Sequence, residues 1–264
     1  MRAAVLTSSM RRHCFVANRL AARLPVVHVW QERKSFEPLR YAADAAEEAV
    51  IARHFAARDA SEEAFFARDD RVEAPATCLP PGGCNDPAVL EAIRRVSPDV
   101  LLVFGTGLLG ASIIDAFPER ILNIHLGLSP YYRGAGTNFW PLVNGEPEYC
   151  GATIHYLDPG VDTGPIVAHV RASMRPGDGP HDIGNRTIVA AVEALADAVA
   201  LRARGRLRGV AQAPGGRVYR RADFSAAAVE RLAGNFRDGM IQAYLRDQPA
   251  RDAALSLVTM ELEA

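Results

Sequence analysis

An uninterrupted apolar run, Val100–Phe104 (VLLVF), constrains the fold of this chain more than any other feature. A strand with one wet face alternates apolar and polar residues, whereas a strand that is apolar throughout is typical of a parallel sheet covered by helices on both faces. Two further apolar runs, residues 3–6 and 25–30, flank residues 11–24, which are compatible with a helix, as in a βαβ unit. We therefore predict an α/β protein with a Rossmann-like, mostly parallel sheet flanked by helices.

The same patterns divide the next part of the chain. Residues 41–70 are rich in Ala, Glu and Arg and predict one or two surface helices. Residues 74–87 contain four prolines and two glycines and predict a loop, after which a helix begins at Asp86-Pro87 and ends near Val96. Apolar or alternating runs predict three more strands, at residues 121–125, 151–157 and 165–170.

The end of the chain predicts a helix followed by a smaller unit. Residues 181–204 carry apolar side chains at helical spacing, and residues 205–217 predict a loop. We predict a main domain at residues 1–205 and a small C-terminal extension at 206–264.

One helical stripe in that extension needs a cover. Its apolar side chains follow a spacing of three, four and four residues: Val229, Leu232, Phe236 and Met240. Either the main domain or a second subunit of a possible homodimer covers this stripe.

The composition excludes several functional classes. The 264 residues include 30 basic and 31 acidic side chains, a formal charge of −1, so no positive excess is present to hold nucleic acid. The chain has no run of 18 apolar residues and its first ten residues are too polar for a signal sequence, which predicts a cytoplasmic protein without a membrane partner. Lys34, the only lysine, lies in no motif, which argues against a P-loop and against Schiff-base chemistry.

The four cysteines lack the spacing of a metal site. Cys14, Cys78, Cys84 and Cys150 form no CxxC pair, so we expect free thiols and no bound metal.

A glycine-rich segment follows the central apolar run. Gly105, Gly107 and Gly110 match the G-x-G-x-x-G pattern of dinucleotide sites. That pattern also needs an acidic residue at the end of the next strand, and this strand ends instead in Asn123-Ile-His125. We therefore favour a glycine-rich turn that permits close backbone approach, with a dinucleotide-dependent oxidoreductase as the alternative.

Two polar side chains and a carboxylate stand near predicted strand ends. Asn123 and His125 are two residues apart, so in an extended strand they point to the same side. Between two later strands, residues 158–165 (DPGVDTGP) form a tight loop that can hold a carboxylate in one place. A lone histidine would be an ordinary partly buried side chain, and Asp158 an ordinary turn residue. Together with Asp162, they indicate a site.

In order and spacing these motifs resemble the N10-formyltetrahydrofolate-dependent formyltransferases. That family includes glycinamide ribonucleotide transformylase, methionyl-tRNA formyltransferase and the sugar N-formyltransferases. The resemblance is good over residues 95–205, is limited to a βαβ outline before them, and is slight in the last 60 residues. Its motifs are Asn123-Ile-His125, residues 128–134 (LSPYYRG), residues 144–146 (NGE), residues 151–155 (GATIH) and residues 158–165.

The resemblance implies three catalytic residues, Asn123, His125 and Asp162. Formyl transfer to an amine passes through a tetrahedral intermediate whose oxygen is anionic, and an amide N–H and an imidazolium can stabilise that oxygen. A carboxylate beside the imidazole favours its charged form and can take the proton that the amine loses, directly or through one water. His155 matches a supporting position, with an ordinary core role equally open.

The resemblance also implies a co-substrate, N10-formyltetrahydrofolate. Its pterin is expected against the backbone of two loops, at Phe104, Gly105, Thr106, Gly107, Leu108, Leu109, Asp158, Gly160 and Val161. For the amine acceptor, side chains near a predicted helix start can bind a phosphate or carboxylate, and a turn arginine can assist: Ser8, Ser9, Arg11, Arg12 and Arg133.

Three comparisons within the family predict the acceptor. Glycinamide ribonucleotide enzymes carry a glycine-rich phosphate loop after the first strand, where this chain has residues 7–13 (TSSMRRH). Methionyl-tRNA enzymes carry a sizeable C-terminal tRNA-contacting domain, where only about 60 residues without basic excess follow here. Residues 138–141 (NFWP) resemble the sugar-modifying branch, so we expect an amino sugar, nucleotide-linked. A formyltetrahydrofolate deformylase, with water as acceptor, is the alternative.

Overall fold

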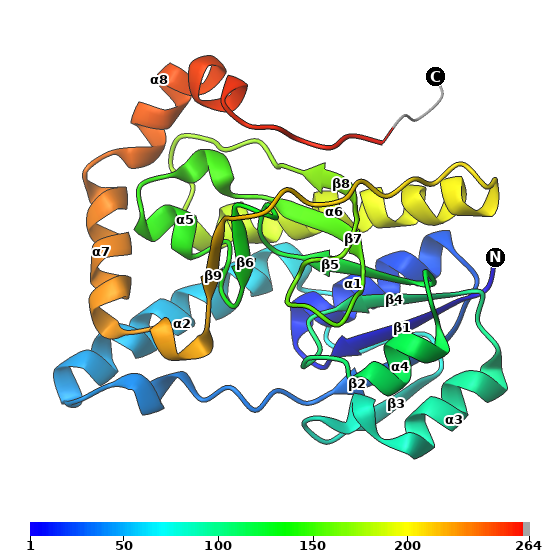
Figure 1. Cartoon of the computed structure of the whole chain (residues 1–264). Coiled ribbons are helices and arrows are strands. Elements are labelled where there is room, and N and C mark those ends of the chain that lie inside the picture. Colours follow the sequence, from blue (N-terminus) through cyan, green and yellow to red (C-terminus); the bar gives the residue numbers. More distant parts are fainter. Residues whose placement is uncertain (261–264) are drawn as a thin grey trace.

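The computed structural model describes residues 1–260, which contain a seven-stranded sheet and a two-stranded ribbon. The sheet has the order β3-β2-β1-β4-β5-β7-β8, and β7 alone runs antiparallel to its neighbours. The mostly parallel sheet is therefore confirmed (Figure 1). The strands are β1 (Ala3–Ser8), β2 (Val26–Glu32), β3 (Ala76–Leu79), β4 (Val100–Phe104), β5 (Ile121–His125), β6 (Tyr132–Gly134), β7 (Ala152–Tyr156), β8 (Ile166–Val170) and β9 (Arg217–Tyr219).

Helices cover both faces of the sheet (Figure 1). In β4, Leu102 packs in one core with α1 and α6, while its neighbours Leu101 and Val103 pack in the other core with α3 and α4. This alternation explains why the strand is apolar at every position. The helices are α1 (Arg11–Arg23), α2 (Ala45–Phe66), α3 (Pro87–Val96), α4 (Ala111–Ala116), α5 (Trp140–Val143), α6 (Pro180–Ala203), α7 (Ala226–Arg237) and α8 (Met240–Ala253).

The predicted loop at residues 74–87 was wrong in part, because it contains β3. This edge strand pairs with β2 in parallel, and two of its bonds to β2 use carbonyls at its ends, Pro75 to the Val29 N–H and Leu79 to the Arg33 N–H. A proline keeps its carbonyl as an acceptor although it lacks an N–H. The prolines therefore flank a short edge strand rather than exclude one.

Residues 41–70 form one helix, α2, rather than two. The Asp44 side chain caps it by accepting hydrogen bonds at 2.9 Å from the N–H groups of Ala46 and Glu47. Between residues 1 and 260, no helix has the length and apolar character needed to cross a bilayer.

The predicted stripe through Met240 is broken. α7 ends at Arg237, and Gly239 adopts a left-handed φ of 78° before α8 begins. Leu232 and Phe236 nevertheless pack in a third core within this chain, together with Trp140 and Tyr244. The division at residue 205 and the homodimer remain predictions, but the chain itself covers much of the stripe.

We predict that Phe236→Asp lowers the free energy of unfolding by about 1–3 kcal/mol without changing the molecular mass in sedimentation. The physical reason is that the substitution places a charge against the third core of the same chain. Thermal melting and analytical ultracentrifugation provide the two readouts, with exposed Arg237→Ala on the same helix as control. A smaller species with an unchanged melting temperature would place the stripe in a subunit interface instead.

Candidate active site

The pairing of β5 with β7 gathers the polar candidates. Asn123 lies opposite His155, and His125 lies opposite Thr153. Because opposite residues share one face of a sheet and positions two apart do likewise, all four side chains project from the same face. His155 is fully buried, and His125 is only 6% exposed. The spacing of Asn123 and His125 therefore gives the geometry expected of it.

The loop between β7 and β8 brings the predicted carboxylate to this face. Oδ2 of Asp162 lies 3.2 Å from Nδ1 of His125, and its Oδ1 lies 3.7 Å from Nε2 of His155. The Gly134 N–H donates to Oδ2 at 2.8 Å. Asp162 has a φ of 52°, in the left-handed region that few side chains other than Asp and Asn adopt readily.

Hydrogen bonds inside the loop fix its path. Oδ1 of Asp158 accepts from the Thr163 hydroxyl at 2.8 Å and from the Gly160 N–H at 3.2 Å. At Gly164 a Cβ atom would lie 1.8 Å from the Tyr156 carbonyl oxygen, so only glycine permits this approach. Asp158 thus shapes the loop that presents Asp162, which is the role of a turn residue.

Gln212 holds the same loop from outside, and sequence reasoning missed it. Its amide group donates to the carbonyl of Asp162 at 2.8 Å and to that of Gly164 at 2.7 Å. The residue lies in the segment predicted as a plain loop, 50 positions from Asp162. No local pattern marks a glutamine whose partners are that far along the chain.

Both ring nitrogens of His125 face acceptors. Nδ1 faces Asp162, and Nε2 lies 3.0 Å from the Tyr132 carbonyl oxygen. A neutral imidazole has one N–H, so only the protonated ring satisfies both partners. Gly127 leaves room for the ring, since a Cβ there would lie 2.7 Å from Nε2.

Burial and charge act on the two groups in opposite ways. Burial lowers the pKa of His125 below its ordinary value, although Asp162 and the Tyr132 carbonyl oppose this. Burial alone would raise the pKa of Asp162, but the groups around it, with His125 first and the Gly134 N–H among them, outweigh burial and lower that pKa to about 2. Asp162 is therefore ionised at neutral pH, and its charge is the main influence that keeps His125 able to take a proton.

His155 orients Asn123. Nδ1 of His155 lies 2.8 Å from the Tyr156 carbonyl oxygen, to which it donates. Its Nε2 then accepts from the Asn123 amide nitrogen at 3.0 Å. The second N–H of that amide stays available, and Asn123 is partly exposed.

The glycine-rich turn after β4 is tied to the β2 and β3 side of the sheet. Gly105 has a φ of 74°, and its carbonyl accepts from Lys34, the lysine that matched no motif. The Gly107 N–H donates to Glu32 at 2.9 Å, and Asn85 bonds both the Leu108 carbonyl and the Gly110 N–H. These partners hold the turn without a ligand.

Each loop predicted to hold the pterin presents an apolar side chain to water. Leu108 is 76% exposed and Val161 is 39% exposed. Leu109 and Leu157, from the same two parts of the chain, pack against one core. The remaining predicted positions, Phe104, Thr106 and Gly160, lie in or beside these loops.

The predicted acceptor-binding residues are largely engaged elsewhere. Arg12 forms a hydrogen-bonded ion pair with Glu62 of α2, and Arg11 donates to the Ala67 carbonyl at 3.2 Å. Arg133 donates to the Gly215 carbonyl at 2.9 Å. Ser8 is buried at the end of β1, and its hydroxyl has no partner among residues 1–260, whereas Ser9 is exposed.

The four cysteines are free thiols. Cys14, Cys84 and Cys150 are buried thiols and Cys78 is an exposed one. Within residues 1–260, no group of three or more His, Cys, Asp or Glu side chains is arranged to hold a metal ion.

We predict that Asp162→Asn lowers the pKa of His125 further, because the carboxylate is the main group opposing the effect of burial. Titration of the histidine ring nitrogens by NMR measures this shift. Asp115→Asn, which removes an exposed carboxylate of α4, provides the matched control. An unchanged His125 pKa in the Asp162 variant would contradict the coupling.

Comparison with known proteins places this geometry in a family. The profile described as "Formyl transferase" matches residues 4–199. Methionyl-tRNA formyltransferase of Syntrophus aciditrophicus is 39% identical over 99 residues, 37% of this chain and 31% of that protein. Its counterpart from Anaeromyxobacter dehalogenans is 34% identical over 137 residues, 52% of this chain and 44% of that protein. The match thus spans less than half the length of these relatives.

Solved structures share the fold. Phosphoribosylglycinamide formyltransferase from Anaplasma phagocytophilum has a TM-score of 0.57 at 16% identity, covering 83% of this chain and 97% of that one. A formyltransferase from Anoxybacillus kamchatkensis, in complex with UDP-4,6-dideoxy-4-formamido-L-AltNAc and tetrahydrofolate, has a TM-score of 0.51 at 19% identity, covering 87% and 97%. The family profile spans the sheet, Asn123, His125, His155 and Asp162. This chain belongs to the formyl transferase family.

Proposed function

We propose that this protein transfers a formyl group from N10-formyltetrahydrofolate to the amine of a small molecule. The observation that carries the proposal is the buried contact of His125 with an ionised Asp162 beside the Asn123 amide. The co-substrate supplies the formyl carbon that the amine attacks. The side chains of this site would stabilise the negative oxygen and accept the proton that the amine loses.

The residues match the charges that the reaction creates. As the amine nitrogen bonds to the formyl carbon, the carbonyl oxygen becomes negative and the nitrogen must lose a proton. The free N–H of Asn123 donates to the oxygen, and the positive charge of a protonated His125 stabilises it. Asp162 accepts the proton, directly or through one water. The carbonyl then re-forms as the bond to the folate nitrogen breaks, and the proton held by Asp162 passes to that nitrogen, directly or through one water, to give tetrahydrofolate.

The two loops fit a flat heterocyclic ligand. Leu108 and Val161 expose apolar surface that a pterin or its aromatic substituent would remove from water. The turn around Gly107 is pinned by Glu32 and offers backbone groups without a side chain. The neighbour from Anoxybacillus kamchatkensis holds tetrahydrofolate, which supports the same co-substrate here.

For the acceptor we favour an amino sugar linked to a nucleotide. Solved neighbours include a protein from Mycobacterium tuberculosis described as a likely sugar N-formyltransferase, with a TM-score of 0.57 at 19% identity over 85% of this chain and 77% of that one. Phe139, in the segment resembling that branch, contacts His54 and Phe224 with centroids 5.5 and 5.6 Å away. These partly exposed rings offer a stacking surface for a base.

An anionic part of the acceptor would lie at the start of α1. The unpartnered Ser8 hydroxyl and the exposed Ser9 support this position. Arg11 and Arg12 would have to leave their partners on α2 to contribute, so we assign them a smaller part than the hydroxyls.

Methionyl-tRNA is the second candidate acceptor, because the methionyl-tRNA formyltransferase of Syntrophus aciditrophicus is 39% identical over 99 residues. The formal charge of −1 gives no general attraction to a polyanion. Water is the third, which would make the protein a deformylase.

We predict that the protein formylates nucleotide-linked amino sugars when it is incubated with them and N10-formyltetrahydrofolate. Mass spectrometry of the sugar nucleotide detects the added formyl group. Parallel reactions contain simple amino sugars, glycinamide ribonucleotide, methionyl-tRNA or no amine. His125→Ala and Asp162→Ala should each lower the rate at least about 100-fold while the fold stays intact, because they remove oxyanion and proton-transfer assistance. Formylation of methionyl-tRNA would identify tRNA as the acceptor in place of the amino sugar. Release of formate in the reaction without amine would identify water as the acceptor. Near-normal turnover in either variant would sink the catalytic assignment.

We predict that Gly107→Val weakens binding of 5-formyltetrahydrofolate, since the branched side chain would intrude where the pterin approaches. Space is already limited there, because a Cβ at this position would lie 3.0 Å from Glu32. Calorimetry compares the variant with the wild type, and Gly184→Ala, which has open space around its Cβ, serves as control. Measurable NAD(P)H binding by the wild type would favour the oxidoreductase alternative.

A further inference from the structure

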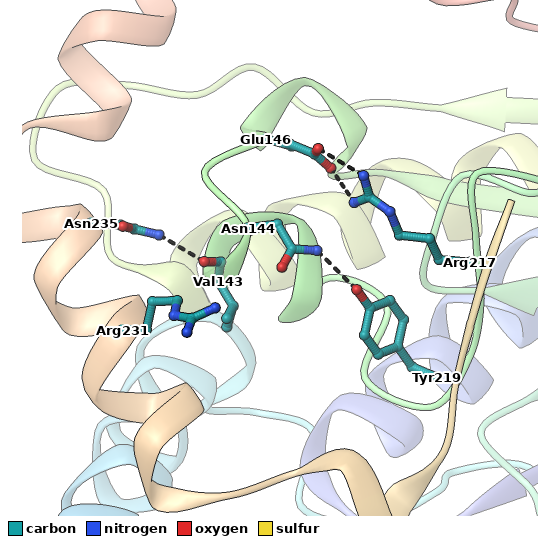
Figure 2. Close-up of a pocket in the computed structure, with 7 residues that line it drawn as sticks. All are labelled: Val143, Asn144, Glu146, Arg217, Tyr219, Arg231 and Asn235. Atoms are coloured by element: carbon teal, nitrogen blue, oxygen red, sulfur yellow. Dashed lines mark hydrogen bonds and ion pairs between the residues drawn. The ribbon is translucent and has the colours of Figure 1, made fainter.

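A cavity lies beside the phenol of Tyr132, the residue whose backbone carbonyl faces His125. It has a volume of about 480 Å³ and is lined by residues of α5, α7 and β9 and of the turn after α5. Figure 2 shows its polar side chains, which are Asn144, Glu146, Arg217, Tyr219, Arg231 and Asn235. Within residues 1–260, none of these side chains forms a hydrogen bond or ion pair with Asn123, His125, His155 or Asp162.

The hydrogen bonds around this cavity do not use every donor that lines it. The Asn144 amide group donates to the hydroxyls of Tyr132 and Tyr219, each at 2.9 Å. Asn235 donates to the carbonyls of Leu142 and Val143, at 2.8 and 3.0 Å. Because the Tyr219 hydroxyl accepts from Asn144, its own O–H remains free to donate.

Arg231 has no partner in the part of the chain that the structure describes. Within residues 1–260 its guanidinium makes no hydrogen bond, ion pair or ring contact, although it lines the cavity. Arg217 is bound to Glu146 through both terminal nitrogens. Two arginines and one carboxylate leave an excess of one positive charge, so the cavity favours an anion.

The wall that carries the phenol is rigid. The Tyr219 ring stacks on Trp140 with centroids 4.4 Å apart, and on Tyr132 at 5.8 Å. The Tyr219 hydroxyl, held in place by this stacking, and the Arg231 guanidinium line the same cavity. Their O–H and N–H groups are donors that an oxyanion can accept.

We propose that this cavity binds an oxyanion of the phosphoryl or carboxylate class, held by Arg231, Arg217 and the Tyr219 hydroxyl. The site is separate from the folate and amine sites, so its occupation does not depend on formyl transfer. Phosphoryl and carboxylate groups share the bidentate acceptor geometry that a guanidinium recognises.

Tyr132 connects the cavity to the catalytic histidine. Its phenol contacts Asn144, Glu146 and Arg217, while its backbone carbonyl faces His125 Nε2 at 3.0 Å. An anion that binds Arg217 competes with Glu146 for that guanidinium, and the Tyr132 ring lies beneath it. Tyr132 thus links the proposed anion site to His125.

The test is calorimetric titration with inorganic pyrophosphate and, separately, citrate, at constant ionic strength and without folate or amine. We expect saturable binding to the wild type that weakens at least about tenfold in Arg231→Ala, since a charge-assisted hydrogen bond is lost. Exposed Arg237→Ala, on the same helix but outside the cavity, should bind like the wild type. A preference for pyrophosphate identifies a phosphoryl ligand, and a preference for citrate a carboxylate.

Tyr219→Phe keeps the stacked ring and removes only the hydroxyl, so it tests the site without disturbing the core. We expect it to weaken binding about threefold or more. Absence of saturable binding to the wild type, or equal affinity in the wild type and Arg231→Ala, would overturn the proposal. Neither outcome would bear on the proposed formyl transfer, because no formyl donor is present in the titration.

Discussion

The antiparallel pairing of β5 with β7 is the constraint on which the site depends. It fixes Asn123 opposite His155 and His125 opposite Thr153, so the imidazole and amide groups have one possible face. Had β7 shifted by one residue, His155 would point to the other face of the sheet and Asn123 would lose its acceptor. The loop that follows β7 then has only to fold back for Asp162 to meet both histidines.

In the pair formed by Asp162 and His125, burial and the neighbouring groups have opposite effects on the charge of each side chain. Desolvation disfavours the charged form of each group, yet Asp162 stays ionised because donors surround it. His125 faces two acceptors that favour its charged form, whereas burial lowers its pKa below the ordinary value. A negative oxygen that develops nearby would favour the imidazolium, which places the proton where charge appears.

Local patterns predicted the parts of this structure that local physics determines. The apolar run Val100–Phe104 predicted a doubly covered strand, and the spacing of Asn123 and His125 predicted their common face. β3 was missed because prolines at its ends obscured a four-residue edge strand. Arg12 was assigned to a ligand, and only the packing of α1 against α2 reveals its partner Glu62, 50 residues away.

Two residues that support Asp162 come from beyond the predicted boundary at residue 205. Gln212 holds the backbone of Asp162, and Tyr219 in β9 pairs with Gly134, whose N–H donates to the Asp162 side chain. Local sequence patterns cannot reveal such partners, because each of these interactions joins positions at least 28 residues apart. Residues beyond 205 therefore support the loop of Asp162, and a chain cut at 205 would lose the two hydrogen bonds that Gln212 donates to the carbonyls of Asp162 and Gly164.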